Sequence, residues 1–333
     1  NNFIVKPSEQ VPMTQTKICE ILEDVGLPEG VLNMVHGAHD VVNGLLDHPD
    51  VEGISFVGST PTAKYIYQRC GETGKRVQSL GGAKNIVAVM PDADLEAAMP
   101  SMITSFYGCT GQRCLSGSVL VPVGDVADEL IEKFSAAAKA MKVGSGLDEQ
   151  ALMGPLATAA HKEKVLGYIE KGIEEGADLV MDGRDFTVAE YPNGFFVGPT
   201  LFDNVTPDMT IAKEEIFGPV VSVVRAKDLD EVIDLINTRG FGNAACIYTN
   251  DGGTAREGQR PEGPGPGQRA GGGQGRTLDV GALVDVHVVW GAIAQLADGA
   301  VGHGIHHAHR TGLGEKRLGV DGELAGQPAL EME

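Results

Sequence analysis

Apolar residues along the first three quarters of the chain recur in two patterns, short continuous runs and longer stretches with helical spacing. The short runs are typical of strands buried in a sheet, and apolar positions three or four residues apart are typical of amphipathic helices. The predicted strands cover residues 2–5, 31–35, 53–57, 76–80, 85–89, 220–224 and 244–248. The predicted helices cover residues 14–25, 41–46, 60–70, 95–106, 126–141, 159–175 and 229–237. Strands and helices that alternate at this spacing predict βαβ units, a mainly parallel sheet and the α/β fold class.

The regular pattern ends at about Arg256. Residues 257–276 contain eight glycines and three prolines but a single aliphatic residue, Ala270, and residues 251–333 contain no Phe, Tyr or Cys. One explanation is a disordered linker followed by a small domain, in which residues 280–296 pack as a short element. The other explanation is that this segment is not the native continuation, as when the reading frame changes near Arg256.

Composition and charge narrow the class of protein. A chain of 333 residues, 42% hydrophobic and 22% charged, suffices for one large domain or two ordinary ones. Its formal net charge of −20 argues against a nucleic-acid or membrane-surface partner, and no apolar run is long enough to span a bilayer. The five cysteines are an odd set without metal-ligand spacing or a secretory signal. We therefore expect a reduced, cytoplasmic protein without a metal site.

Cys114 lies in a glycine-rich segment, residues 108–115, directly after the predicted helix 95–106. A cysteine in such a turn is accessible to a substrate. A thiolate nucleophile needs a lowered pKa or nearby positive charge and amide donors, which Arg113 and the turn would supply. A single cysteine in a loop is more often a packed core thiol, so this motif alone leaves both interpretations open.

Five motifs occur in the order and approximate spacing of the aldehyde dehydrogenase superfamily. They are residues 6–9 (KPSE), 26–33 (GLPEGVLN), 56–60 (FVGST), 111–114 (GQRC) and 214–219 (EEIFGP). Residues 1 to about 256 therefore resemble that superfamily. Four further motifs are similar to its CoA-acylating methylmalonate-semialdehyde dehydrogenase branch. They are residues 35–43 (VHGAHDVVN), 64–67 (KYIY), 82–85 (GAKN) and 90–93 (MPDA).

The resemblance implies a Rossmann-type NAD-binding part and an α/β catalytic domain. We expect residues 1–82 to be the C-terminal part of the NAD-binding domain and residues 83–256 to be the catalytic domain. Residues 257–333 would be an atypical tail, frame-shifted or disordered. The resemblance also implies that the chain is a fragment, because the family's N-terminal portion and the strands expected after the catalytic domain have no counterpart. The full-length family implies a homo-oligomer.

The resemblance implies that six residues bind NAD: Lys6, Glu9, Gly58, Ser59, Glu215 and Phe217. Gly58 and Ser59 stand between a strand and a helix, where a hydroxyl and free helix amides can meet a pyrophosphate. An ordinary capped helix start would explain them without the resemblance. The lysine and glutamate would contact the adenosine ribose, or else be solvated turn residues. Glu215 would hold the nicotinamide ribose and Phe217 would flank the nicotinamide ring. Without the resemblance they would be a surface acid and a core aromatic.

Leu80 stands where most aldehyde dehydrogenases carry the glutamate of Glu-Leu-Gly-Gly-Lys, which activates water against the thioester. Leucine cannot take a proton. Either another carboxylate substitutes, or the thioester waits for a thiol, as it does in the CoA-acylating branch. Arg113 then gains a second role, because a guanidinium binds a substrate carboxylate through paired hydrogen bonds. The alternative for Arg113 is that it ties down the backbone of its loop.

Together these features predict NAD-dependent oxidation of methylmalonate or malonate semialdehyde to propionyl-CoA or acetyl-CoA. Cys114 would attack the aldehyde, hydride would pass to NAD, and coenzyme A would remove the acyl group after loss of CO2. The predicted partners are the semialdehyde, coenzyme A and further copies of the chain. One alternative is a hydrolytic aldehyde dehydrogenase with a relocated base. Another is a catalytically inactive chain that keeps only nucleotide binding or subunit contacts.

Overall fold

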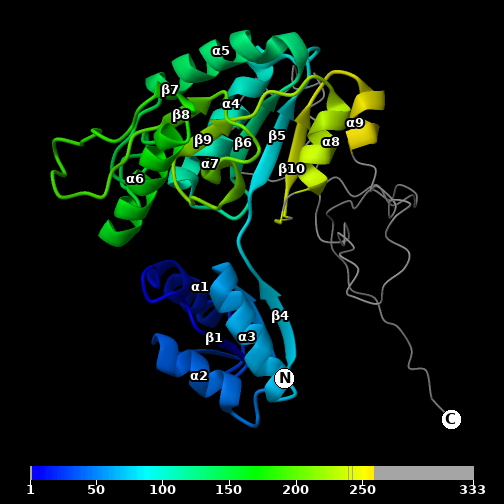
Figure 1. The fold of residues 1–333 in the computed structure, drawn as a ribbon. Coiled ribbons are helices and arrows are strands. Elements are labelled where there is room, and N and C mark those ends of the chain that lie inside the picture. Colours follow the sequence, from blue (N-terminus) through cyan, green and yellow to red (C-terminus); the bar gives the residue numbers. More distant parts are fainter. Residues whose placement is uncertain (1, 239, 242, 259–333) are drawn as a thin grey trace, which may run out of the picture. The chain divides into compact units, whose positions relative to one another are not determined.

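The computed structural model describes residues 2–238, 240–241 and 243–258 and has an α/β architecture, as the sequence predicts (Figure 1). The predicted atypical tail lies outside the described residues from position 259 onward. None of the helices in the described part of the chain is both long and apolar enough to cross a membrane. Within these same residues, no group of three or more His, Cys, Asp or Glu side chains is placed to hold a metal ion.

The N-terminal region, residues 2–80, consists of two parallel strand pairs, each joined through a helix. Its strands are β1 (Phe3–Val5), β2 (Leu32–Met34), β3 (Gly53–Val57) and β4 (Arg76–Leu80). Its helices are α1 (Met13–Asp24), α2 (His39–Asp47) and α3 (Thr60–Glu72). The buried core of this region is small and contains Leu46, Ile66 and Cys70.

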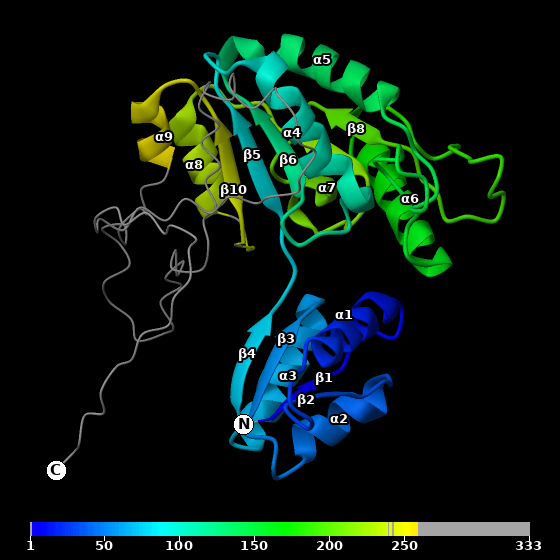
Figure 2. The same ribbon diagram turned by 180° about the vertical axis from the view of Figure 1, so that it is seen from behind.

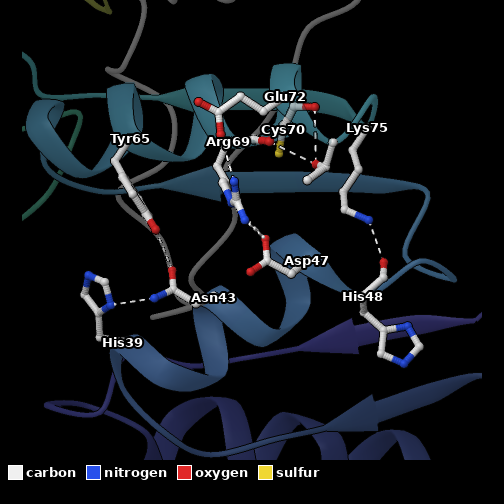
Figure 3. Close-up of polar contacts among 10 residues, drawn as sticks. His39, Asn43, Asp47, His48, Tyr65, Arg69, Cys70, Glu72 and Lys75 are labelled. Atoms are coloured by element: carbon white, nitrogen blue, oxygen red, sulfur yellow. Dashed lines mark hydrogen bonds and ion pairs between the residues drawn. The ribbon is translucent and has the colours of Figure 1, made fainter.

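Polar contacts add to this small core by joining α2 to α3 (Figure 3). The Tyr65 hydroxyl donates to Asn43 Oδ1 over 2.7 Å, and Arg69 Nε donates to Asp47 Oδ1 over 2.8 Å. Lys75 Nζ donates to the carbonyl of His48, just after α2, over 2.6 Å. The two helices are thus linked along their length.

The sheet region, residues 85–258, contains a six-stranded sheet in the order β10-β5-β6-β9-β8-β7. Its strands are parallel except for the edge pair β7–β8. They are β5 (Asn85–Val89), β6 (Gly117–Pro122), β7 (Asp178–Met181), β8 (Thr200–Asp203), β9 (Val220–Val223) and β10 (Ala245–Tyr248). The helices are α4 (Leu95–Tyr107), α5 (Ala127–Ala140), α6 (Ala159–Glu174), α7 (Thr210–Lys213), α8 (Leu229–Asn237) and α9 (Gly252–Gly258).

Helices cover both faces of this sheet (Figure 2). Residues of α4 and α5 pack with Val87 and Val89 on one face, and residues of α6, α7 and α8 pack with Ile86 and Ala88 on the other. Every residue of β5 is therefore buried, which explains why its sequence reads as a continuous apolar run rather than an alternation.

The predicted strands and helices are all present, with ends shifted by a few residues at most. The sequence analysis missed strands β6, β7 and β8 and the short helices α7 and α9. Strand β6 begins with Gly117 and Ser118 directly after the cysteine-containing turn, so its start resembles a loop continuation. Strands β7 and β8 have four residues each, and an aspartate at one end of each leaves too few apolar positions for the pattern to identify a strand.

Candidate active site

The segment that carries Cys114 starts with an unusual turn at the end of α4. Cys109, Thr110 and Gly111 have φ values of 52°, 60° and 67°, all in the left-handed region. A Cβ at Gly111 would lie 2.4 Å from the carbonyl oxygen of Gly218, so the turn packs directly on the 214–219 segment. Non-glycine residues in this conformation cost about 1–2 kcal/mol each, so the surrounding structure must hold the turn in place.

Side chains of the turn bind the loop that precedes α6. The Thr110 hydroxyl donates to the carbonyl of Gly154 over 2.8 Å, and Gln112 Oε1 accepts a hydrogen bond from the backbone N–H of Ala157 over 3.1 Å. Thr110 is almost completely buried. These two contacts supply part of the energy that offsets the strained backbone.

Arg113 caps the end of α4. Its Nη2 donates to the carbonyls of Thr104, over 2.5 Å, and Ser105, over 3.2 Å, and its Nε donates to Ser116 Oγ over 3.3 Å. A cation at a helix C-terminus is favoured, since the unpaired carbonyls there carry partial negative charge. The structure therefore supports the interpretation that Arg113 ties down the loop backbone. Its role toward a substrate carboxylate stays a prediction.

Cys114 is exposed, and its backbone is held by two asparagines. Asn85 Nδ2 donates to the Cys114 carbonyl over 2.8 Å, and Asn243 Nδ2 donates to the same oxygen over 2.6 Å. Cys109, on the same turn, is also exposed. The fold thus presents a thiol at position 114 on an accessible and well-anchored main chain.

Three predicted site residues, Arg113, Glu215 and Phe217, line one pocket together with the buried side chain of Lys84. The pocket has a volume of about 10 Å³, room for one water molecule. Glu215 Oε1 accepts the backbone N–H of Ala83 over 3.1 Å. The structure therefore brings the Cys114 turn next to the segment predicted to bind the nicotinamide end of NAD.

The backbone of Phe217 is also left-handed, with a φ of 59°. Its carbonyl oxygen lies 2.6 Å from His161 Nε2, so this nitrogen must carry the proton and donate. The two rings meet edge to face at a centroid distance of 6.2 Å. His161, at the start of α6, thus fixes the position of the phenylalanine ring.

The other four predicted cofactor residues lie in the N-terminal region. Lys6 Nζ pairs with Glu9 Oε2 over 3.0 Å. Hydrogen bonds from its own backbone N–H and from Lys6 lower the pKa of Glu9. Gly58 and Ser59 connect β3 to α3, and the Ser59 hydroxyl shares a hydrogen bond of 2.9 Å with that of Thr62. Ser59 makes no side-chain cap to the helix amides, so the N–H groups of Thr60 and Thr62 in the first turn of α3 stay available, while Pro61 has none.

Leu80 is the last residue of β4, opposite Val57 in the register of the β3–β4 pair. Leu80 is 48% exposed, so its side chain is not packed into a hydrophobic core. The position that carries a glutamate in most of the superfamily is therefore accessible here but holds no titratable group.

Sequence reasoning missed Asn85, His161 and Asn243 as parts of the site. Asn85 is the polar residue that opens a buried apolar run and belongs to the GAKN motif, but neither feature indicates its contact with Cys114. No local signal marks the other two, because their partners are 56 and 129 positions away in the sequence.

Comparison with known proteins identifies the family of the chain. The aldehyde dehydrogenase family model matches residues 1–260, so the chain belongs to that family. Malonate-semialdehyde dehydrogenase 2 of Geobacillus kaustophilus is 54% identical over 257 residues, which cover 77% of this chain and 53% of that protein. The malonate-semialdehyde dehydrogenase of Pseudomonas aeruginosa is also 54% identical, over 77% of this chain and 52% of its own. The chain thus spans about half the length of the curated relatives it matches.

Two solved structures have the same fold. A methylmalonate-semialdehyde dehydrogenase from Sinorhizobium meliloti, complexed with NAD, superposes with a TM-score of 0.75 at 47% identity. It is matched over 77% of this chain and 52% of its own. A methylmalonate-semialdehyde dehydrogenase from Oceanimonas doudoroffii gives the same TM-score and identity over 77% and 53% of the two chains. The predicted family and fold class are thereby confirmed.

Proposed function

We propose that this chain carries the cysteine, cofactor and acyl-transfer elements of an NAD-dependent, CoA-acylating semialdehyde dehydrogenase. Malonate semialdehyde and methylmalonate semialdehyde are the proposed substrates, because the relatives named above act on them by name. The observation that carries the acylating reaction is Leu80, an accessible leucine at the place of the family's usual base. The proposed division is a cofactor part at residues 1–82 and a catalytic part at residues 83–256.

The residues present fit NAD at both ends. Helix α3 begins at Thr60, and the N–H groups of Thr60 and Thr62 in its first turn suit a pyrophosphate. Lys6 and Glu9 offer a donor and an acceptor to ribose hydroxyls. As the family resemblance implies, Glu215 offers a carboxylate to the nicotinamide ribose and Phe217 an aromatic ring to the nicotinamide. When bound, NAD supplies the acceptor for the hydride that leaves the substrate.

Cys114 is the proposed nucleophile. Its thiolate sulfur bonds to the aldehyde carbon and the carbonyl oxygen becomes the alkoxide of a thiohemiacetal. Departure of hydride converts this adduct to a thioester on Cys114. The acyl group of either proposed substrate then carries a free carboxylate, which leaves as CO2. The electron pair of the broken C–C bond stays on the carbon beside the thioester as an enolate, and that carbon takes up a proton from solvent. The thiol of coenzyme A attacks the thioester, and the sulfur of Cys114 leaves as thiolate.

Arg113 is proposed to bind the substrate carboxylate in addition to capping α4. Three of its five N–H donors contact Thr104, Ser105 and Ser116. The two on Nη1 make no hydrogen bond to the described residues and stay available to a carboxylate. The role in the loop and the role toward substrate are thus compatible.

The test uses a completed chimera, residues 1–256 of this chain extended with the flanking segments of the Geobacillus kaustophilus relative. With NAD, malonate semialdehyde and CoA, the products identified by mass spectrometry should be acetyl-CoA and NADH. Leu80→Glu should raise the CoA-independent formation of free acid, by up to roughly 10²-fold if the new carboxylate can place a water. Leu80→Gln is the matched control, because it adds a polar group but no base. Equal free-acid rates for the parent chimera and both variants, all at the full rate seen with CoA, would contradict acyl transfer to CoA.

We also propose a homo-oligomeric, cytoplasmic enzyme whose partners are small molecules. The net charge of −20 supports the absence of nucleic-acid and membrane-surface partners, since it opposes binding to phosphates. Light scattering on the completed chimera, with the mass of a single chain as the contradicting result, tests the oligomer.

A further inference from the structure

Two side-chain amides from distant parts of the chain meet the main-chain carbonyl of Cys114. Asn85, the first residue of β5, donates to this oxygen over 2.8 Å, and Asn243, just before β10, donates over 2.6 Å. These two residues, the asparagine pair, are 29 and 129 positions from Cys114 in the sequence. Tertiary structure alone brings them to the proposed nucleophile.

Asn85 is buried, with only 4% of the residue exposed, and both its amide nitrogen and its amide oxygen form hydrogen bonds near Cys114. Besides the Cys114 carbonyl, Nδ2 donates to the carbonyl of Ser116 over 2.7 Å, and Oδ1 accepts from the backbone N–H of Ala244 over 3.1 Å. A buried amide with every group satisfied holds its partners in one geometry, because losing any of these bonds leaves a polar group unpaired. Asn85 therefore joins the turn, the approach to β6 and the approach to β10.

The asparagine pair also fixes the main chain that carries the thiol. Two N–H groups aimed at the carbonyl oxygen of Cys114 hold its peptide group in place, and the sulfur extends from the same residue. A nucleophilic atom must be held in a defined position toward the atom it attacks.

We propose that Asn85 and Asn243 are positioning residues that hold the Cys114 peptide group, and with it the thiol, in the place needed for attack on a substrate. The inference rests on the proposed function, in which Cys114 is the nucleophile. If the pair served only to stabilise the fold, the reactivity of Cys114 would not depend on it specifically. Cys109 offers an internal standard, since it is exposed on the same turn but its carbonyl accepts from the backbone N–H of Gln112 instead.

The experiment measures the rate at which iodoacetamide alkylates the full chain at one fixed pH, a reaction in which the cysteine sulfur displaces iodide. Peptide mass mapping gives separate rates for Cys114 and Cys109. Asn85→Asp keeps the shape of the side chain but replaces the donor by an acceptor. Asn243→Ala removes the second donor at an exposed position, and Asn243→Gln is the conservative variant that keeps an amide donor.

We expect Cys114 alkylation to slow by roughly five- to tenfold in Asn85→Asp and by roughly threefold in Asn243→Ala, because the thiol is no longer held in place. Cys109 should stay within about twofold of its parent rate, as should Cys114 in Asn243→Gln. Changes of the same size at both cysteines, or an unchanged Cys114 in folded variants, would overturn the inference. If circular dichroism shows that Asn85→Asp does not fold, the two Asn243 variants decide by the same criteria.

Alkylation needs neither NAD nor aldehyde, so the inference and the proposed function fail separately. A completed chimera that forms no NADH, while alkylation of Cys114 slows as expected in the variants, would contradict the proposed function alone. A chimera that forms NADH, with alkylation of Cys114 unaffected by the variants, would contradict the positioning role alone.

Discussion

The N-terminal region and the sheet region are built from the same alternation of strands and helices but bury their apolar residues very differently. In the first, α1 has no buried residue, and strands β3 and β4 alternate between exposed and half-buried positions. In the second, every residue of β5, β8 and β9 is buried under helices on both faces. Met13 and Val25, at 82% and 74% exposure, show how much apolar surface the N-terminal region leaves uncovered among the described residues.

This contrast explains where the proposed chemistry sits. The strained turn at Cys109–Gly111 persists only where rigid neighbours over-determine it, and the hydrogen bond from Thr110 to Gly154 and the packing against Gly218 supply that rigidity. The proposed pyrophosphate contact at Ser59 needs only the start of a helix, which a region with a small hydrophobic core can provide. The proposed thiol site and the proposed pyrophosphate contact thus stand in regions that differ in their degree of burial.

The largest expected effect is the loss of NADH formation when Cys114, in the sheet region, is replaced. In the completed chimera, Cys114→Ala should lower NADH formation by several orders of magnitude, on the order of 10³-fold or more, because hydride transfer depends on the covalent adduct. Cys109→Ala, on the same exposed turn, should keep most of the activity. NADH absorbance measures both, and similar losses for the two variants would mean that the nucleophile is misassigned.

The difference in burial should also appear in backbone dynamics. Amides of α1 are expected to exchange with solvent at nearly the rate of an unfolded chain, whereas those of β5 and β6 should exchange only on global unfolding of their region. Hydrogen-exchange mass spectrometry on the full chain measures the two sets in one experiment. Comparable protection of α1 and β5 would remove the distinction between the regions.

Two glycine substitutions test the difference between the two regions at single residues. Gly111→Ala should destabilise the sheet region by at least about 2 kcal/mol, because Gly111 is left-handed and a Cβ would meet the Gly218 carbonyl. Gly44→Ala, inside α2 with nothing within 4 Å of the added carbon, should stabilise the N-terminal region by about 0.5–1 kcal/mol. Urea unfolding followed region by region with pulsed hydrogen exchange gives both changes in the free energy of unfolding. Changes of the same sign in the two variants would contradict the comparison.

A further effect is expected on alkaline stability. Burial raises the pKa of Tyr248 to about 12, and burial together with Glu214 raises the pKa of Tyr168 to about 12. The fold therefore favours the protonated phenols, so their contribution to stability is complete below the unfolded-state pKa of about 10 and is lost as pH rises toward 12. Urea midpoints should fall over that interval and fall less in Tyr248→Phe. A variant with the same alkaline loss as the parent would show that Tyr248 is not a source of it.

Sequence patterns predicted the fold well where local signals are strong. The continuous apolar run at β5 and the helical spacing of α8 identify these elements with their bounds. The turn geometry at Cys109 and Thr110 was beyond prediction, because neither residue type favours the left-handed conformation and only tertiary contacts impose it. The family motifs located Cys114 and Glu215, but the asparagine pair depends on contacts across 29 and 129 positions.

The central claim is that the acyl group on Cys114 waits for a thiol because Leu80 provides no base. The most direct measurement is rapid-mixing absorbance of NADH from the completed chimera with malonate semialdehyde and NAD, with and without CoA. Without CoA, the account predicts a burst of one NADH per active site followed by a rate reduced roughly 10²-fold or more, and with CoA, steady turnover. The same steady rate in both cases, with free acid as the product, would contradict the account.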